Sequence, residues 1–147
     1  MNIKYKIEPG TQQDFPELTA VWEASVKASH HFLSEEDIQF YKPLVKNEYL
    51  KLLDIFLARR DNGSIAGFVG LADNKIEMLF IASELRGRGI GKTLLAYAIV
   101  ELNAREVDVN EQNEAAVAFY LSQGFKIRSR SKLDSTGKNF PILHLSL

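Results

Sequence analysis

A glycine-rich loop between a buried strand and a helix places the strongest constraint on how this chain folds. Residues 76–81 are apolar apart from Glu77, which predicts a strand. Residues 86–91 follow with glycine at every second position, and then comes a helix carrying Leu94, Leu95, Ala98, Ile99 and Leu102. Glycine lets the backbone approach a ligand closely, and a helix N-terminus carries partial positive charge. The unit therefore predicts a binding site for phosphate or pyrophosphate.

Three nucleotide-binding patterns compete at this loop. A P-loop requires glycine five residues before Gly91, where the chain has Arg86. A Rossmann fingerprint requires glycine three residues after Gly89, where the chain has Lys92. The third pattern, Arg/Gln-x-x-Gly-x-Gly, fits with Arg86, Gly89 and Gly91 in its three fixed places. On the loop alone, a flexible turn without a ligand stays the alternative.

The remaining periodicities predict a chain of the α/β (α+β) class. Strands are expected over residues 3–7, 53–58, 65–72, 76–81, 107–109, 125–133 and 142–147. Helices are expected from Asp14, from Ser34, after Gly91 and over residues 113–123, with Pro43 kinking or splitting the second. Strand, loop, helix and strand over residues 76–109 predict one parallel pair in a mostly antiparallel sheet. The length of 147 residues fits a single domain, 1–147.

Composition excludes several classes of function. The chain has no cysteine, so disulfides, cysteine-bound zinc and thiol nucleophiles are excluded, and its three histidines lack metal-ligand spacing. A net charge of −1 with scattered basic residues argues against nucleic-acid binding. The longest apolar helical run, residues 94–100, is far shorter than the ~18 residues that suggest a membrane span. The N-terminus lacks the apolar stretch of a signal peptide, which predicts a cytoplasmic protein.

The chain resembles the GNAT acetyltransferase family over nearly its whole length. Residues 76–81 resemble the family's fourth strand, and residues 86–92 resemble its pyrophosphate loop. Asn113-x-x-Ala116-x-x-x-Tyr120, followed by Gly124-Phe125, is similar to the family's second signature. The segment around Trp22-x-x-Ser25 and residues 30–34 resembles the YjaB-like subgroup of small bacterial members.

The resemblance implies a GNAT fold whose sheet, flanked by helices, splays apart between the fourth and fifth strands. It implies acetyl-CoA as co-substrate in that cleft and no metal. The residues expected at the cofactor are Leu79, Phe80, Ile81, Arg86, Gly87, Arg88, Gly89, Ile90, Gly91, Lys92 and Asn113. The reaction implied is direct attack of a neutral primary amine on the thioester in a ternary complex.

That reaction needs an acid for the leaving thiolate and a base for the amine. The family motif places Tyr120 as the acid, and a modest shift would match a tyrosine pKa of ~10 to a thiol pKa of ~8.5. The alternative is that Tyr120 only packs in the core. Glu77 and Asp108 are both candidate bases, and strand alternation places Glu77 on the face of Leu79 and Ile81. Histidine at residue 30 or 31 is a third candidate, while His144 is expected to be structural.

The loop between the first two helices is expected to shape the acceptor site. Its candidate residues are Trp22, His30, Phe32 and Tyr41, and the acceptor is a small-molecule or protein amine. The alternative function is a non-catalytic acyl-CoA sensor, which would need neither Tyr120 nor a base. An RNA-modifying toxin of the same fold is disfavoured by the net charge of −1. Monomer and homodimer both stay open.

Overall fold

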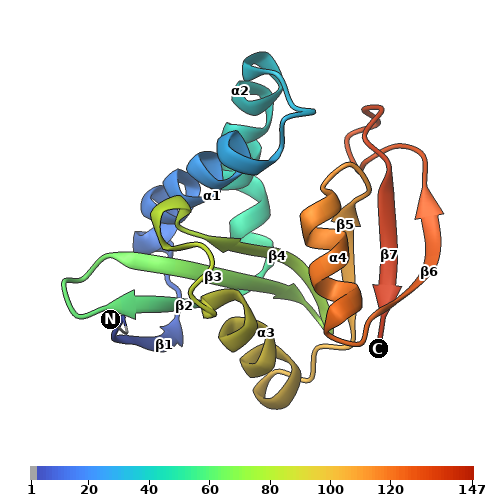
Figure 1. Ribbon diagram of the computed structural model, residues 1–147. Helices are drawn as coiled ribbons and strands as arrows, with labels where there is room; N and C mark the ends of the chain where they lie inside the picture. Colours follow the sequence, from blue (N-terminus) through green and yellow to red (C-terminus); the bar gives the residue numbers. More distant parts are fainter. Residues whose placement is uncertain (1–2) are drawn as a thin grey trace.

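The computed structural model describes residues 3–147, and its elements follow the predicted order (Figure 1). The strands are β1 Tyr5–Pro9, β2 Asp54–Arg60, β3 Ile65–Ala72, β4 Lys75–Ile81, β5 Glu106–Asn110, β6 Lys126–Ser131 and β7 Ile142–Ser146. The α-helices are α1 Phe15–Ser29, α2 Glu35–Leu44, α3 Ile90–Glu101 and α4 Glu114–Ser122. Short helical turns lie at Gln12–Asp14, Val45–Tyr49, Leu50–Leu52 and Ser83–Leu85.

The strands form one seven-stranded sheet in the order β1-β2-β3-β4-β5-β7-β6. Every neighbouring pair is antiparallel except β4 and β5, which confirms the predicted single parallel pair. That pair contains only two matched positions, Lys75 with Glu106 and Ile76 with Val107. Beyond Ile76 the two strands diverge, so the sheet splays between its fourth and fifth strands as expected (Figure 1).

Two hydrophobic cores cover the two faces of the sheet. The first packs α1, α2 and the turn after α2 against β2–β4, and Leu18, Leu50, Leu57 and Phe68 are fully buried there. The second packs α3 and α4 on the opposite face, around residues such as Leu94, Val107 and Phe125. Because β4 lies between the two cores, its side chains alternate between the two groups of helices.

A bulge in β4 interrupts this alternation at Glu77. Gly70 is paired with Met78 and Leu71 with Ile76, so Glu77 is an extra residue without a partner on β3. A bulge turns two successive side chains to the same side of a strand. Glu77 therefore shares the side of Met78, toward α1 and α2, and the expectation that it shares a face with Leu79 and Ile81 is wrong.

The helix starts test the capping residues that were predicted from the sequence. Ser34 caps α2 as predicted, since its Oγ accepts a hydrogen bond from the Asp37 amide at 3.0 Å. α2 ends one residue after Pro43, at Leu44, and a π-helical turn follows. Asp14 precedes α1 but makes no capping bond to it.

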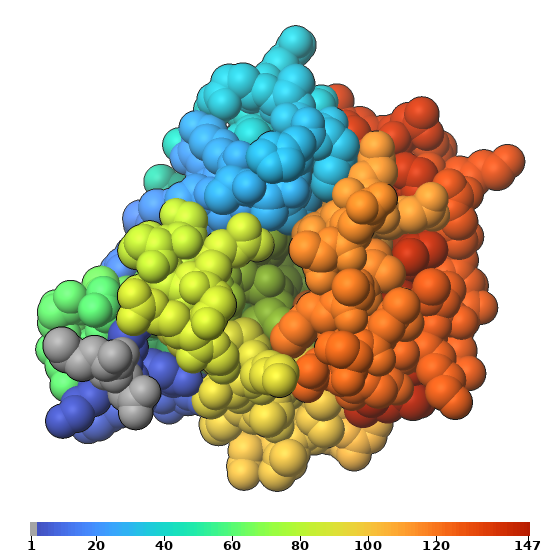
Figure 2. All heavy atoms as spheres, viewed as in Figure 1, coloured from blue at the N-terminus to red at the C-terminus, as the bar shows by residue number. Residues whose placement is uncertain are grey.

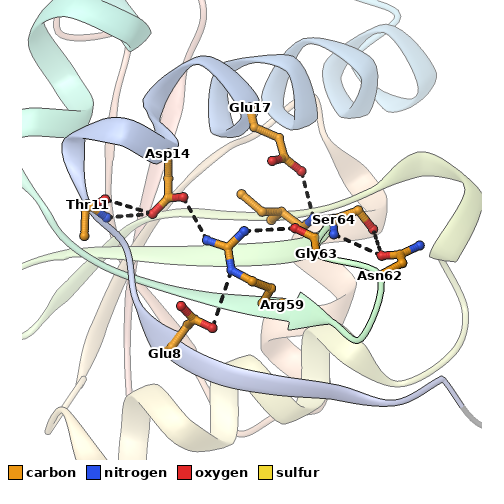
Figure 3. A network of polar contacts seen from close by, with 9 residues as sticks. Glu8, Thr11, Asp14, Glu17, Arg59, Asn62, Gly63 and Ser64 are labelled. Atoms are coloured by element: carbon orange, nitrogen blue, oxygen red, sulfur yellow. Dashed lines mark hydrogen bonds and ion pairs between the residues drawn. The ribbon is translucent and has the colours of Figure 1, made fainter.

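The Asp14 carboxylate instead joins a polar network around Arg59, which ties α1 to the sheet (Figure 3). Arg59 contacts Asp14 at 2.8 Å and Glu8 at 3.4 Å, and donates to the Gly63 carbonyl at 2.9 Å. Glu17 on α1 accepts the Ile65 amide at 2.8 Å. These bonds fix the start of α1 on the β2–β3 hairpin, and thereby set where the other end of the helix lies.

Candidate active site

The glycine loop adopts a conformation that only glycine tolerates easily. Gly87 and Gly89 have φ values of 76° and 83°, in the left-handed region. A Cβ added at either residue would meet no atom within 4 Å, so backbone conformation rather than packing requires these glycines. Gly89 also precedes α3 without a side-chain cap, which leaves the first amides of the helix available to an anion.

A cavity of about 470 Å³, named here the donor cavity, lies between this loop, β4 and α4. Figure 2 shows the hollow between the α1–α2 segment, the loop before α3, and α4. Its lining includes most of the residues expected at the cofactor, namely Leu79, Phe80, Ile81, Arg86, Gly87, Gly89, Ile90, Gly91, Lys92 and Asn113. Arg88 is the exception, because it lines a separate hollow with Lys4 and Arg60. Two cationic side chains, an uncapped helix N-terminus and open glycines suit a diphosphate, and so fit the pyrophosphate of acetyl-CoA.

Tyr120 lies on α4 where the donor cavity meets the sheet. Its ring packs edge-on against Phe119 and Phe125, and only 6% of the residue is exposed. Within residues 3–147 no group hydrogen-bonds to its hydroxyl, and burial alone raises the pKa of Tyr120 well above its usual value. The phenol therefore stays protonated across the working pH range, and the direction of the shift is away from the pKa of a free thiol in water.

A second cavity of about 410 Å³, the acceptor cavity, lies on the other side of β4. Its walls are mainly apolar and aromatic, and they include Trp22, Val26, Leu33, Tyr41, Val45, Tyr49, Met78, Phe80, Phe140 and Ile142. Two carboxylates, Glu77 and Asp134, also line it. Of the four acceptor candidates, Trp22, His30 and Tyr41 line this cavity. Phe32 does not, but packs against His30 and Phe140 at ring distances of 5.2 and 5.9 Å.

A small third cavity of about 90 Å³ occupies the seam where β4 and β5 separate. Glu77, Asp108, Asn113 and Tyr120 are among its lining residues. His30 and Phe80 line this cavity as well as the donor and acceptor cavities. The donor and acceptor sides therefore meet at the splayed seam, around these two side chains.

The two candidate bases lie in one ionic network but in different surroundings. Lys75 contacts Glu77 at 3.1 Å and Asp108 at 3.0 Å. Asp108 is also bound by His144, whose Nδ1 lies 2.7 Å from the other carboxylate oxygen. Glu77 keeps one oxygen outside these contacts and faces the acceptor cavity, whereas both oxygens of Asp108 are engaged. In residues 3–147 no group of three potential metal ligands comes together.

His30 ends α1 and is 6% exposed. Its Nδ1 lies 2.8 Å from Ser29 Oγ, and its Nε2 lies 3.4 Å from Nδ2 of Asn113, the residue that caps α4. Burial first, and then the positive charges of Arg86 and His31, lower its pKa to about 4. The imidazole is therefore neutral at physiological pH. Its ring also packs against Phe32 and Phe80, at ring distances of 5.2 and 6.3 Å.

The roof of the acceptor cavity joins two distant segments, α2 and the loop between β6 and β7. Tyr41 donates a hydrogen bond to Asp134, and Lys138 lies 3.8 Å from Asp37 and 4.4 Å from the centre of the Phe40 ring. Asp134 and Phe140 were not among the residues expected from the sequence. Residues 134–137 have the composition of an ordinary turn, and no local signal indicates that this turn reaches α2.

Comparison with known proteins agrees with this geometry. Residues 24–138 match the family model described as an acetyltransferase (GNAT) domain. The peptidyl-lysine N-acetyltransferase YjaB of Salmonella typhimurium is 36% identical over 139 residues, covering 95% of each chain. The solution structure of apo YjaB from Escherichia coli superposes with a TM-score of 0.89 at 35% identity, covering 98% of this chain and 97% of that one.

A more distant structure shares the fold. The PaiA N-acetyltransferase of Thermoplasma acidophilum, solved in complex with coenzyme A, has a TM-score of 0.76 at 23% identity, covering 99% of this chain and 100% of that one. Within residues 3–147, no helix has the length and hydrophobicity needed to cross a membrane. From the matching family model and the YjaB relatives, we conclude that the chain belongs to the GNAT acetyltransferase family and is an N-acetyltransferase with acetyl-CoA as acetyl donor.

Proposed function

We propose that this enzyme acetylates lysine side chains of proteins or peptides by direct attack of the lysine amine on bound acetyl-CoA. The observation that carries the proposal is the meeting of the donor and acceptor cavities at the β4–β5 seam. A donor in one cavity and an amine in the other would place the two reacting groups together without a covalent enzyme intermediate. The peptidyl-lysine activity named for the YjaB relatives supports lysine as the acceptor.

The donor cavity would hold acetyl-CoA through backbone and charge. The amides at the start of α3, together with Arg86 and Lys92, would bind the pyrophosphate. Beyond Ile76, the β5-facing edge of β4 has no partner strand within residues 3–147. We expect Leu79 and Ile81 to offer backbone groups there to the pantetheine arm, and a free amide to stabilise the oxyanion.

The acceptor cavity suits a lysine because it combines an apolar wall with carboxylates. The four methylene groups of a lysine would pack against the aromatic residues Trp22, Tyr49 and Phe80. Glu77 is better placed than Asp108 to act as the base, since it faces this cavity and keeps one oxygen free of ion pairs. We assign Glu77 as the base, acting directly or through water, and Asp108 as the residue that positions Lys75.

Tyr120 would act as the acid when the thiolate leaves. The new C–N bond forms as the C–S bond breaks, the amine loses one proton to Glu77, and the sulfur gains the phenolic proton. Burial raises the pKa of a thiol as it raises that of a phenol, so the buried thiolate is also a stronger base than in water. The two groups therefore remain matched although the pKa of Tyr120 is raised.

The test is acetyl transfer to a defined peptide with a blocked N-terminus and a single lysine. We expect release of one thiol per acetyl group and a mass increase on the lysine, and no reaction with the same peptide carrying arginine instead. Acetylation of small amines with none on lysine peptides would refute the lysine assignment. Binding of acetyl-CoA without transfer to the lysine of the peptide would refute the proposed acceptor.

A further inference from the structure

We propose that His30 Nε2 accepts a hydrogen bond from the attacking amine and thereby aims the amine's lone pair at the thioester. The inference rests on the proposed function, since it concerns the acceptor of the same reaction. Its starting point is position: His30 and Phe80 are the two residues that line the donor, acceptor and seam cavities alike. An amine entering from the acceptor cavity reaches the donor cavity past this imidazole.

The hydrogen bonds around His30 determine which ring nitrogen carries the hydrogen. Asn113 Oδ1 accepts the Ala116 amide at 3.3 Å when it caps α4, so its Nδ2 group must face His30. An NH₂ group only donates, hence His30 Nε2 is an acceptor and the hydrogen sits on Nδ1. Nδ1 then donates to Ser29 Oγ at 2.8 Å, and the Ser29 hydroxyl donates to the Ser25 carbonyl at 2.8 Å.

This chain of bonds leaves one basic atom, Nε2, directed from the end of α1 toward α4 across the cleft. Its contact with Asn113, at 3.4 Å, is near the long limit of a hydrogen bond and is therefore weak. An amine N–H brought to the seam can replace it at little cost. Displacement would also free the Asn113 amide, which the family resemblance places at the cofactor.

The charges around His30 favour a role in orienting the amine over a role as the general base. Burial, Arg86 and His31 all disfavour the imidazolium form of His30. A neutral imidazole accepts a hydrogen bond without taking the proton, which leaves Glu77 to receive it. An amine holds two N–H bonds and one lone pair, so fixing one N–H on His30 and another near Glu77 leaves the lone pair facing the donor cavity. Such positioning lowers the barrier by restricting the amine to the reactive geometry.

Two amide substitutions, each of which can mimic one of the two ring nitrogens, distinguish the role of Nε2 from that of Nδ1. His30→Gln can place its amide oxygen where Nε2 lies, so it keeps the acceptor for the amine. His30→Asn can keep the Nδ1-like donor to Ser29 but has no atom at the Nε2 position. We expect His30→Asn to lose roughly 10–10²-fold in kcat and His30→Gln to recover most of it. Acetyl-CoA affinity by calorimetry should be the same in both.

Ser29→Ala provides a variant that keeps the imidazole. It removes the partner that holds the hydrogen on Nδ1, so the ring can adopt the other tautomer, and kcat should fall roughly 3–10-fold with unchanged acetyl-CoA affinity. The assays use whichever amine the wild type acetylates, so an enzyme that rejects lysine peptides but acetylates small amines refutes only the proposed function. Wild-type kcat in His30→Asn, or equal losses in the asparagine and glutamine variants, would overturn the role of Nε2.

Discussion

The donor and acceptor sides of the cleft are built in different ways. The donor side is lined mainly by residues 79–92, from β4, the loop that follows it and the first turn of α3, and α1 and α4 complete its walls. The acceptor side draws on α1, α2, the turn after α2, β4 and the β6–β7 loop, which lie far apart in the sequence. Backbone conformation shapes the first, and packing between side chains shapes the second. The difference predicts that substitutions on each side affect one substrate and spare the other.

Gly89→Glu gives the largest expected effect and acts on the donor side alone. The new carboxylate would enter the proposed pyrophosphate site, and like charges placed together cost several kcal/mol. We expect acetyl-CoA affinity to fall by roughly 10³-fold or more, as measured by calorimetry. Gly63→Glu is the matched control, because Gly63 also has a positive φ, 88°, and open space around its Cα.

Both variants bear similar backbone strain and the same added charge. Only Gly89→Glu should therefore lose the donor, while the two melting temperatures fall by similar amounts. Equal affinity in the two variants would show that the loop at residues 86–92 does not hold the cofactor.

Tyr120→Phe should affect the chemical step without affecting binding on either side. If Tyr120 protonates the leaving thiolate, kcat should fall by roughly 10²–10⁴-fold with acetyl-CoA affinity unchanged. Since burial holds the pKa of the phenol far above its usual value, the high-pH limb of the rate profile should be the same in both proteins. Tyr97→Phe, on α3 against Phe56, is the control. Near-normal turnover in Tyr120→Phe would leave Tyr120 with packing alone.

His30 borders both sides, and its pKa makes a prediction about stability. The folded pKa is about 4, whereas the unfolded value is near 6.5. Between these values the unfolded chain binds more protons, so stability is lost as the pH falls from 6.5 to 4. Urea unfolding at pH 7.0 and 4.5 should show about 2–3 kcal/mol more loss in the wild type than in His30→Gln. Identical losses in the two proteins would mean that the pKa of His30 is the same in the folded and unfolded states.

Tyr41→Phe gives the smallest expected effect and acts on the acceptor side alone. It removes the hydrogen bond to Asp134 that joins α2 to the β6–β7 loop. The acceptor KM should rise roughly 3–10-fold, in keeping with one partly exposed hydrogen bond to a charged group, while acetyl-CoA affinity stays constant. Tyr49→Phe removes another hydroxyl from the same cavity without touching this contact. A similar acceptor KM in both variants would show that the hydrogen bond between Tyr41 and Asp134 does not affect acceptor binding.

The same contrast explains what could be predicted from the sequence. The order of elements, the parallel pair and the glycine loop follow from local periodicity and backbone chemistry, and all are found. The facing of Glu77 could not be predicted, because one unpaired residue in β4 reverses strand alternation and leaves no mark in the apolar pattern. The contribution of Asp134 and Phe140 depends on contacts across about a hundred residues of sequence, such as the bond between Tyr41 and Asp134.

The brief pairing of β4 with β5 has a mechanical consequence. The sheet has two parts, β1–β4 and β5–β7–β6, which are joined by two residue pairs at one end of the seam. At the open end, the contacts of Tyr41 with Asp134 and of Lys138 with Asp37 join α2 to the β6–β7 loop, and so connect the two parts. A small change in the angle between the two parts at their paired end would therefore produce a larger displacement at their separated ends. The width of the gap between the glycine loop and α4 thus depends on the angle between the two parts of the sheet. The contacts between α2 and the β6–β7 loop, on the acceptor side, hold that angle.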